Sequence, residues 1–198
     1  LNGDGKIDNG GNKYDDMGDM KKIGNNTPRY LFGLDLNADY KGFDFRAFFQ
    51  GVMKRDYWQG SAYFWGATSL WHSTGFVEHA DYFRAEASND LPANLNAYYP
   101  RPVFDSSKNR QKQTAYLQSA AYIRLKNVQL GYTLPANLTH KFYVSKLRVF
   151  VSGENLWTGT SLANMFDPET IGGGDDTDKN GNAYPLSKTI SFGISVTL

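Results

Sequence analysis

The sequence contains no cysteine and has no long apolar run. The lack of cysteine excludes a disulfide framework and cysteine-ligated zinc or iron–sulfur sites. No window approaches the roughly 18 apolar residues that a membrane-spanning helix needs, and the mean hydropathy is −0.53. Any contact with a membrane must therefore be made by strands.

The sequence has no excess of charge of one sign either, because it contains 21 basic and 20 acidic residues. No lysine and arginine cluster is interleaved with aromatics, so no nucleic-acid partner is predicted. The sequence is instead rich in hydrophobic residues (40%) and aromatic residues (15%), which allows extensive apolar burial. It starts at Leu1-Asn2-Gly3 without an initiator methionine or signal peptide, and we interpret it as a piece of a longer protein.

Alternating apolar and polar residues predict five β-strands. Lys41-Gly42 predicts a tight hairpin between the first two strands. The third pattern changes phase at Lys126-Asn127, which predicts a β-bulge. The predicted strands cover residues of about 29–40, 42–52, 120–133, 146–157 and 189–198.

Short and long connections alternate between these strands. A tight turn and a short proline-containing link contrast with an acidic lead-in at 1–28 and with long segments at 53–119 and 158–188. This is typical of an outer-membrane barrel with short periplasmic turns and long extracellular loops, and strands of about 10 to 12 residues are long enough to cross a bilayer. A soluble β-sandwich is the alternative that alternation alone leaves open. Five strands cannot close a barrel, so the other strands must lie elsewhere in a longer protein.

Four segments carry a family resemblance, and their order and spacing extend along the whole chain. They are LNGDGKID at 1–8, IGNNTPRYLFGLDLNADYKGFDFRAFFQG at 23–51, YIRLKNVQLGYTLP at 122–135 and LRVFVSGENLW at 147–157. Together they resemble the C-terminal part of the SusC/RagA family of TonB-dependent (TonB-linked) outer-membrane transporters of Bacteroidetes.

The resemblance implies an all-β fold in which this chain supplies about five antiparallel C-terminal strands of a transmembrane barrel of about 22 strands. The plug domain would lie outside this chain. The resemblance also implies import of oligosaccharides, or of oligopeptides, with a SusD-like surface lipoprotein. Energy would come from the TonB-ExbB-ExbD complex through the missing N-terminal part. The protein would lie in the outer membrane, in contact with lipid, with its C-terminus in the periplasm.

Two other functions remain open at this point. One is a TonB-dependent receptor for a siderophore or vitamin, which the same barrel permits. The other is a soluble β-rich binding module without transport.

Polar residues of the predicted strands share the face opposite the apolar one, and we predict that they face the barrel lumen. They are Asp35, Asn37, Asp44, Arg46, Gln50, Arg124 and Glu154. Aromatic residues of the segment 53–119 could stack on sugars or hold peptide side chains. These ligand-binding candidates are Tyr57, Trp58, Trp65, Trp71, Tyr98 and Tyr99. Packing of the loop on itself or on a lid protein is the competing interpretation.

The first residues have the alternating oxygen ligands of a calcium loop. The candidate ligands are Asn2, Asp4, the carbonyl of Lys6, and Asp8. The closing acid is missing, because Gly11 stands in its place, and Asp15, Asp16 or Asp19 could replace it. A turn rich in glycine and asparagine is the alternative. A similar but weaker pattern lies at 176–182.

Motifs of catalysis are missing. The histidines His72, His79 and His140 form no HExxH motif, and no nucleophile elbow is present. A metal site at His72 and His79 is conceivable, but incidental histidines on a surface loop are the preferred interpretation. We predict no enzymatic activity and no required cofactor.

Overall fold

The computed structural model describes residues 2–6, 8–69, 71, 75–88, 90–172 and 183–198. Its main element is a five-stranded antiparallel sheet with the strand order β1-β2-β5-β6-β7. The strands are β1 (Arg29–Tyr40), β2 (Phe43–Lys54), β5 (Tyr122–Thr133), β6 (Lys146–Thr160) and β7 (Thr189–Thr197). The predicted all-β fold with five antiparallel strands is confirmed.

The remaining elements are short. A two-stranded sheet pairs β3 (Asp56–Trp58) with β4 (Leu117–Ser119). The helical segments are α1 (Ala62–Trp65), η1 (Val77–Ala80), η2 (Lys108–Arg110), η3 (Thr114–Tyr116), α2 (Ala136–Thr139) and η4 (His140–Phe142). None of the helices in the described ranges has the length and apolar character to cross a membrane.

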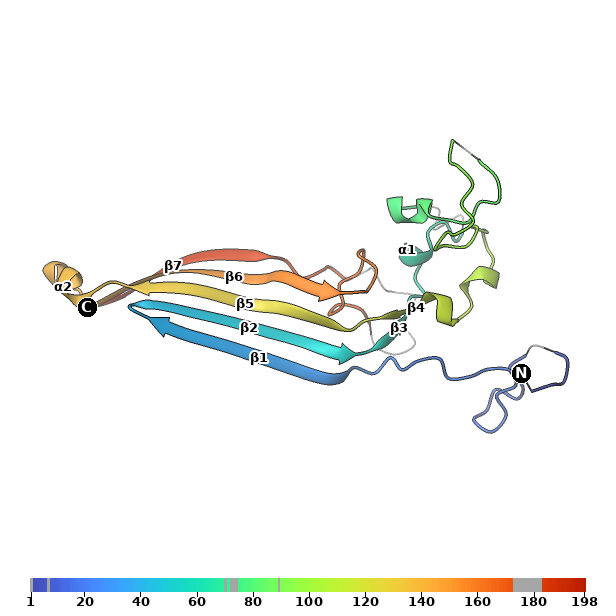
Figure 1. Cartoon of the computed structure of the whole chain (residues 1–198), viewed down its shortest axis with the longest axis horizontal. Helices are drawn as coiled ribbons and strands as arrows, with labels where there is room; N and C mark the ends of the chain where they lie inside the picture. The colour runs from blue at the N-terminus through green and yellow to red at the C-terminus, as the bar shows by residue number, and fades with distance from the viewer. Residues whose placement is uncertain (1, 7, 70, 72–74, 89, 173–182) are drawn as a thin grey trace.

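The long and short connections lie at opposite ends of the sheet (Figure 1). The β1–β2 turn, α2 and the last residue described lie at one end. The N-terminal segment, the β3–β4 ribbon and α1 lie at the other. We call this second end the loop end.

The hairpin turn between β1 and β2 has the backbone geometry that its sequence predicts. Lys41 and Gly42 both have positive φ angles, 48° and 87°. This suits the right-handed twist of the strands that the turn joins. The N–H of Thr133 on β5 donates to the Gly42 carbonyl at 2.7 Å. A Cβ at position 42 would lie 2.9 Å from the Thr133 carbonyl oxygen, so only glycine fits this close approach.

The predicted bulge in the third strand is present at Lys126. In the ladder with β2, Phe48 pairs with Asn127 and Phe49 pairs with Leu125, so that Lys126 has no opposite residue. The register with β6 shifts at the same place. Because the bulge adds one residue, the alternation resumes on the same face after it.

One face of the sheet is apolar on every strand. Residues that pair directly across an antiparallel sheet point to the same side. One such row runs from Ala38 through Phe45, Leu130 and Val151 to Phe192. The opposite face carries polar rows, so the sheet is amphipathic across its full width.

The hydrophobic core lies at the loop end and not on the sheet. Its buried residues come from β3 and α1, from Tyr99, from Ala120 after β4 and from residues 162–171. Phe64 is fully buried at its centre, with rings of Trp65 at 5.1 Å and Tyr99 at 5.4 Å. The two long connections therefore fold against each other into a cap, which we call the loop core.

Candidate functional site

The seven residues predicted to face a lumen lie on the polar face of the sheet. Asn37 pairs with Arg46, and Gln50 pairs with Arg124. Asp35 and Glu154 lie in one row of paired residues, because Asp35 pairs with Phe48, Phe48 with Asn127 and Asn127 with Glu154. The structure thus brings residues from four strands to one surface. That this surface lines a lumen stays a prediction.

Ion pairs join strands across this polar face. Arg46 donates to Asp35 through Nε at 3.2 Å and Nη2 at 2.6 Å. Arg148 of β6 donates through Nε and Nη2 to both carboxylate oxygens of Asp44 on β2. The Arg148–Asp44 pair passes over β5 at Gly131, where any Cβ would collide with both side chains.

A buried ionic cluster lies where the polar face meets the loop end. The Arg124 side chain is 4% exposed and donates from Nη2 to Asp167 at 2.7 Å and from Nε to Thr158 at 2.8 Å. Glu169 accepts from Lys126 at 2.9 Å and lies 3.6 Å from Arg124. A buried guanidinium needs this kind of compensation, since burial of an unpaired charge is very costly.

Asp167 is the centre of this cluster. Its Oδ1 also accepts the N–H of Glu169 and its Oδ2 accepts the N–H of Leu186, at 2.9 and 3.1 Å. Burial raises the pKa of Asp167, but the hydrogen bonds from Arg124 and from these backbone groups outweigh it and hold the pKa below its usual value. The carboxylate therefore stays charged and ties two parts of the β6–β7 connection to the sheet.

The cluster fixes the position of residues 162–172. Arg124 and Thr158 project from the polar face, so the segment that carries Asp167 lies over that face. Arg55 adds a second tie, since its Nη2 donates to the Gly172 carbonyl at 2.9 Å. Sequence reasoning missed Asp167, Glu169 and Arg148, because nothing in their spacing relates them to their partners.

The structure divides the six aromatic candidates into two groups. Tyr57, Trp65 and Tyr99 are 1%, 9% and 7% exposed and belong to the loop core, where they pack against other side chains. For these three the structure shows packing, and direct contact with a ligand stays a prediction. Burial is the largest cause that raises the pKa of Tyr99 to about 12.

The other three aromatic candidates remain predictions. Trp71 is 93% exposed and Tyr98 is 42% exposed. Trp58 is half-buried and lines a hollow described below.

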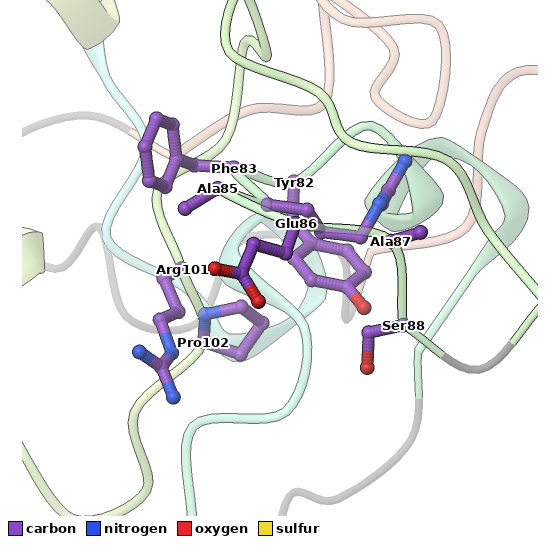
Figure 2. Close-up of a pocket in the computed structure, with 9 residues that line it drawn as sticks. Tyr82, Phe83, Ala85, Glu86, Ala87, Ser88, Arg101 and Pro102 are labelled. Carbon is purple, nitrogen blue, oxygen red and sulfur yellow. The ribbon is translucent and has the colours of Figure 1, made fainter.

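A cavity of about 620 Å³ lies on the segment that follows η1. Figure 2 shows Glu86 and Arg101 on its wall, near Pro102 and the ring of Tyr82. These two charged side chains form no ion pair with each other. Arg84, the buried charged residue of its lining, donates to the carbonyls of Pro92 and Ala80 at 2.8 Å each.

A larger hollow, of about 720 Å³, lies between the lead-in to β1 and the β3–β4 ribbon. Its wall is tied together by a reciprocal contact: the N–H of Asp56 donates to the Asn25 carbonyl at 2.9 Å, and the N–H of Asn25 donates to the Asp56 carboxylate at 2.9 Å. Gly24 fits tightly, because a Cβ there would lie 2.9 Å from side-chain atoms of both Asp56 and Leu117. We call this the lead-in hollow.

The predicted calcium loop is folded around a different acid. Asp19 accepts the N–H of Asn2 at 2.9 Å and the N–H of Asp8 at 3.2 Å. The Asp4 carboxylate accepts the N–H of Lys6 at 2.8 Å. Over the described residues, no three histidine or acidic side chains gather as a metal site would require. A calcium ion at Asn2, Asp4, Lys6 and Asp8 stays a prediction, and the pattern at 176–182 lies outside the described residues.

His79 uses both ring nitrogens within the loop core. Nδ1 accepts the N–H of Phe76 at 2.9 Å, so Nε2 carries the proton and donates to the Phe64 carbonyl at 2.9 Å. With both nitrogens occupied, His79 holds α1 and η1 together. His72 lies outside the described residues.

The curated proteins that match this chain are TonB-dependent receptors. No family model matches the chain. TonB-dependent receptor P3 of Formosa agariphila is 28% identical over 97% of this chain, and TonB-dependent receptor P26 of the same organism is 28% identical over 95%. The chain spans about a fifth of these relatives, 19% and 20% of their lengths.

Solved structures agree with the sequence relatives. The RagAB peptide transporter superposes with a TM-score of 0.64 at 25% identity, over 89% of this chain and 18% of that one. The RagAB peptide importer in its open-open state gives a TM-score of 0.61, also at 25% identity, over 87% of this chain and 17% of that one. Over nearly its whole length the chain is therefore similar to a segment of TonB-dependent receptors, and its fold matches a segment of the RagAB transporter.

Proposed function

We propose that the full-length protein imports oligosaccharides or oligopeptides across the outer membrane in a TonB-dependent manner, together with a SusD-like surface lipoprotein. The observation that carries this proposal is the amphipathic sheet. Its apolar face is exposed on every strand, and its polar face carries fixed ion pairs.

The apolar face suits lipid better than water. On β7, Phe192 is 84% exposed and Ile194 is 70% exposed, and both lie on the apolar face. Monomeric soluble proteins rarely expose apolar patches of more than a few hundred Å². Strands of 12 residues extend about 40 Å, enough to cross a hydrocarbon core of about 30 Å at the usual tilt.

The edges of the sheet require more strands. In the described part of the chain, β1 pairs only with β2, and β7 pairs only with β6. Backbone groups at a free edge have no hydrogen-bond partner in lipid, so further strands of the full-length protein must pair with both edges. The lengths of the relatives leave room for them.

Two observations bear on the class of cargo. The similarity to RagAB, a peptide importer, supports an oligopeptide. The aromatic loop end supports an oligosaccharide as well, because sugar rings stack on exposed aromatic faces such as Trp71.

The long loops would face outward and the end with α2 would face the periplasm, where TonB acts on the part of the protein outside this chain.

The test starts with cell fractionation of the full-length protein. We expect a heat-modifiable band in the outer membrane, co-purification of a lipoprotein, and uptake of labelled oligomers that stops when TonB is deleted. Recovery in the soluble fraction would overturn the proposal.

A matched pair of substitutions tests the orientation of the sheet. Phe192→Arg places a charge on the apolar face, and arginine at the middle of the bilayer destabilises a barrel by about 2–4 kcal/mol. Its neighbour Ser191→Arg places the same charge on the polar face and should be tolerated. If both variants fold equally well, the apolar face does not contact lipid.

A further inference from the structure

We infer that the lead-in hollow binds an anionic oligosaccharide, one whose sugars carry carboxylate or sulfate groups. The inference rests on the proposed import function and names the class of cargo that this surface would recognise. It depends on the charges, the ring and the paired backbone around the hollow.

Three lysines line the hollow from two distant parts of the chain. Lys21 and Lys22 come from the lead-in to β1, and Lys112 comes from the segment before β4. None of them forms an ion pair within the ranges that the structure describes. Three ammonium groups around one hollow attract a ligand with several negative charges.

The two acidic side chains of the hollow are already engaged. Asp56 accepts the N–H of Asn25 and lies 3.5 Å from Arg29. Asp19 accepts the backbone N–H groups of Asn2 and Asp8, and these bonds, of which the one from Asn2 is the larger cause, lower its pKa. Both oxygens of Asp19 and Oδ2 of Asp56 have these partners, whereas the three lysines form no ion pair among the described residues and are available to a ligand.

The remaining walls suit a sugar. The half-buried Trp58 lines the hollow together with Leu117, and Asn25 and Asn26 line it as well and carry side-chain amides. Amides and ammonium groups bind hydroxyl and acidic groups, and aromatic rings pack on the apolar faces of sugars. The volume of about 720 Å³ is in the range of small-molecule sites.

An extended acidic peptide fits less well. A peptide usually joins such a ribbon by adding a strand to a free edge. Here Asp56 of β3 pairs with Ser119 of β4 on one side and with the backbone of Asn25 on the other. The edge beside the hollow is therefore taken at Asp56.

The test uses the full-length receptor in detergent and isothermal titration calorimetry. The probes are a galacturonic acid tetrasaccharide, its neutral methyl ester, a sulfated galactose tetrasaccharide and tetraglutamate. We expect the acidic saccharides to bind, with an affinity that falls as salt is added, and the methyl ester and tetraglutamate to bind at least tenfold more weakly. The two acidic saccharides distinguish carboxylate from sulfate recognition.

Matched lysine variants locate the site. Lys21→Gln, Lys22→Gln and Lys112→Gln combined should weaken binding about tenfold, because each exposed charge contact contributes modestly. The control combines Lys108→Gln, Lys141→Gln and Lys188→Gln, which are exposed lysines outside the hollow, and should leave affinity unchanged. Both variants should keep the heat-modifiable band of the wild type, which shows that they fold.

Equal binding of the methyl ester, an unchanged affinity in the first variant, or equal binding of tetraglutamate would each overturn the inference. None of these results bears on import itself. A receptor that reaches the outer membrane and imports a cargo but fails this binding test leaves the proposed function standing. A receptor that is not in the outer membrane overturns the proposed function.

Discussion

The tie between Arg124 and Asp167 gives the sharpest test of how the loop end is held on the sheet. The perturbation is Asp167→Asn, which keeps the shape of the side chain and removes its charge. Arg124 would lose its shortest charged partner, at 2.7 Å, and would keep Thr158 and the more distant Glu169 at 3.6 Å.

The expected magnitude follows from burial. The side chains of Arg124 and Asp167 are 4% and 7% exposed. Removing one partner from a buried ion pair typically costs about 3–5 kcal/mol. Because Glu169 still offers some compensation, we expect the low end, about 3 kcal/mol, which favours opening of the segment roughly a hundredfold.

Hydrogen exchange of the full-length receptor in detergent measures this opening. Backbone protection of residues 162–172 should fall by about two orders of magnitude in Asp167→Asn, while β5 and β6 stay protected. The control is Asp35→Asn, which removes the same charge from the pair with Arg46 on the same face. That pair is 57% and 38% exposed, so its loss should change exchange only a few-fold.

A double variant separates the tie from a general defect. If Arg124→Gln and Asp167→Asn act through each other, the two together should open the segment little more than one alone. Unchanged protection of residues 162–172 in Asp167→Asn would refute the assignment. So would fully additive effects in the double variant.

Three further predictions concern other parts of the molecule. Gly131→Ala should break the Arg148–Asp44 pair and lower stability by about 1 kcal/mol in denaturant titrations, and the loss should be smaller in an Arg148→Gln background, where no ion pair is left to break. An unfolded tyrosine ionises at about pH 10, whereas the pKa of the buried Tyr99 is raised to about 12. The loop core should therefore lose stability as the pH rises from about 10 to about 12. Tyr99→Phe should reduce this loss in thermal scans. Added calcium should protect residues 2–19 from protease and a chelator should reverse it, with Asp19→Asn as the variant that abolishes the effect; equal cleavage with and without calcium would count against the site.

The sheet was predictable because its information is local. The β1–β2 hairpin follows from alternation on both sides of Lys41-Gly42, and the bulge at Lys126 follows from a phase change within one strand. The strand ends were less accurate: β2 extends to Lys54 and β6 extends to Thr160, beyond the predicted 52 and 157. There the alternation fades, but pairing with the neighbouring strand continues.

The loop end was not predictable because its contacts are far apart in sequence. Arg124 and Asp167 are 43 positions apart, and Arg55 and Gly172 are 117 apart. Whether Tyr57 or Trp58 is buried also depends on which face of β3 meets the loop core, which three residues of sequence do not show. Composition indicated that aromatics matter in this segment, and only the fold shows which of them pack and which stay available.

The two halves of the molecule are stabilised by different surroundings. The loop core buries Phe64 and Tyr57 against protein, and Trp65 donates from Nε1 to the Gln59 carbonyl at 2.8 Å within it. The apolar side chains of the sheet are instead exposed, as on Phe192 and Ile194, and contact the solvent or amphiphile around the protein. An amphiphile is therefore required by the sheet and not by the cap, so that changes of detergent should alter the strands first. The ionic cluster at Arg124 is where the two regions meet, which is why we expect removal of the Asp167 charge to loosen the cap.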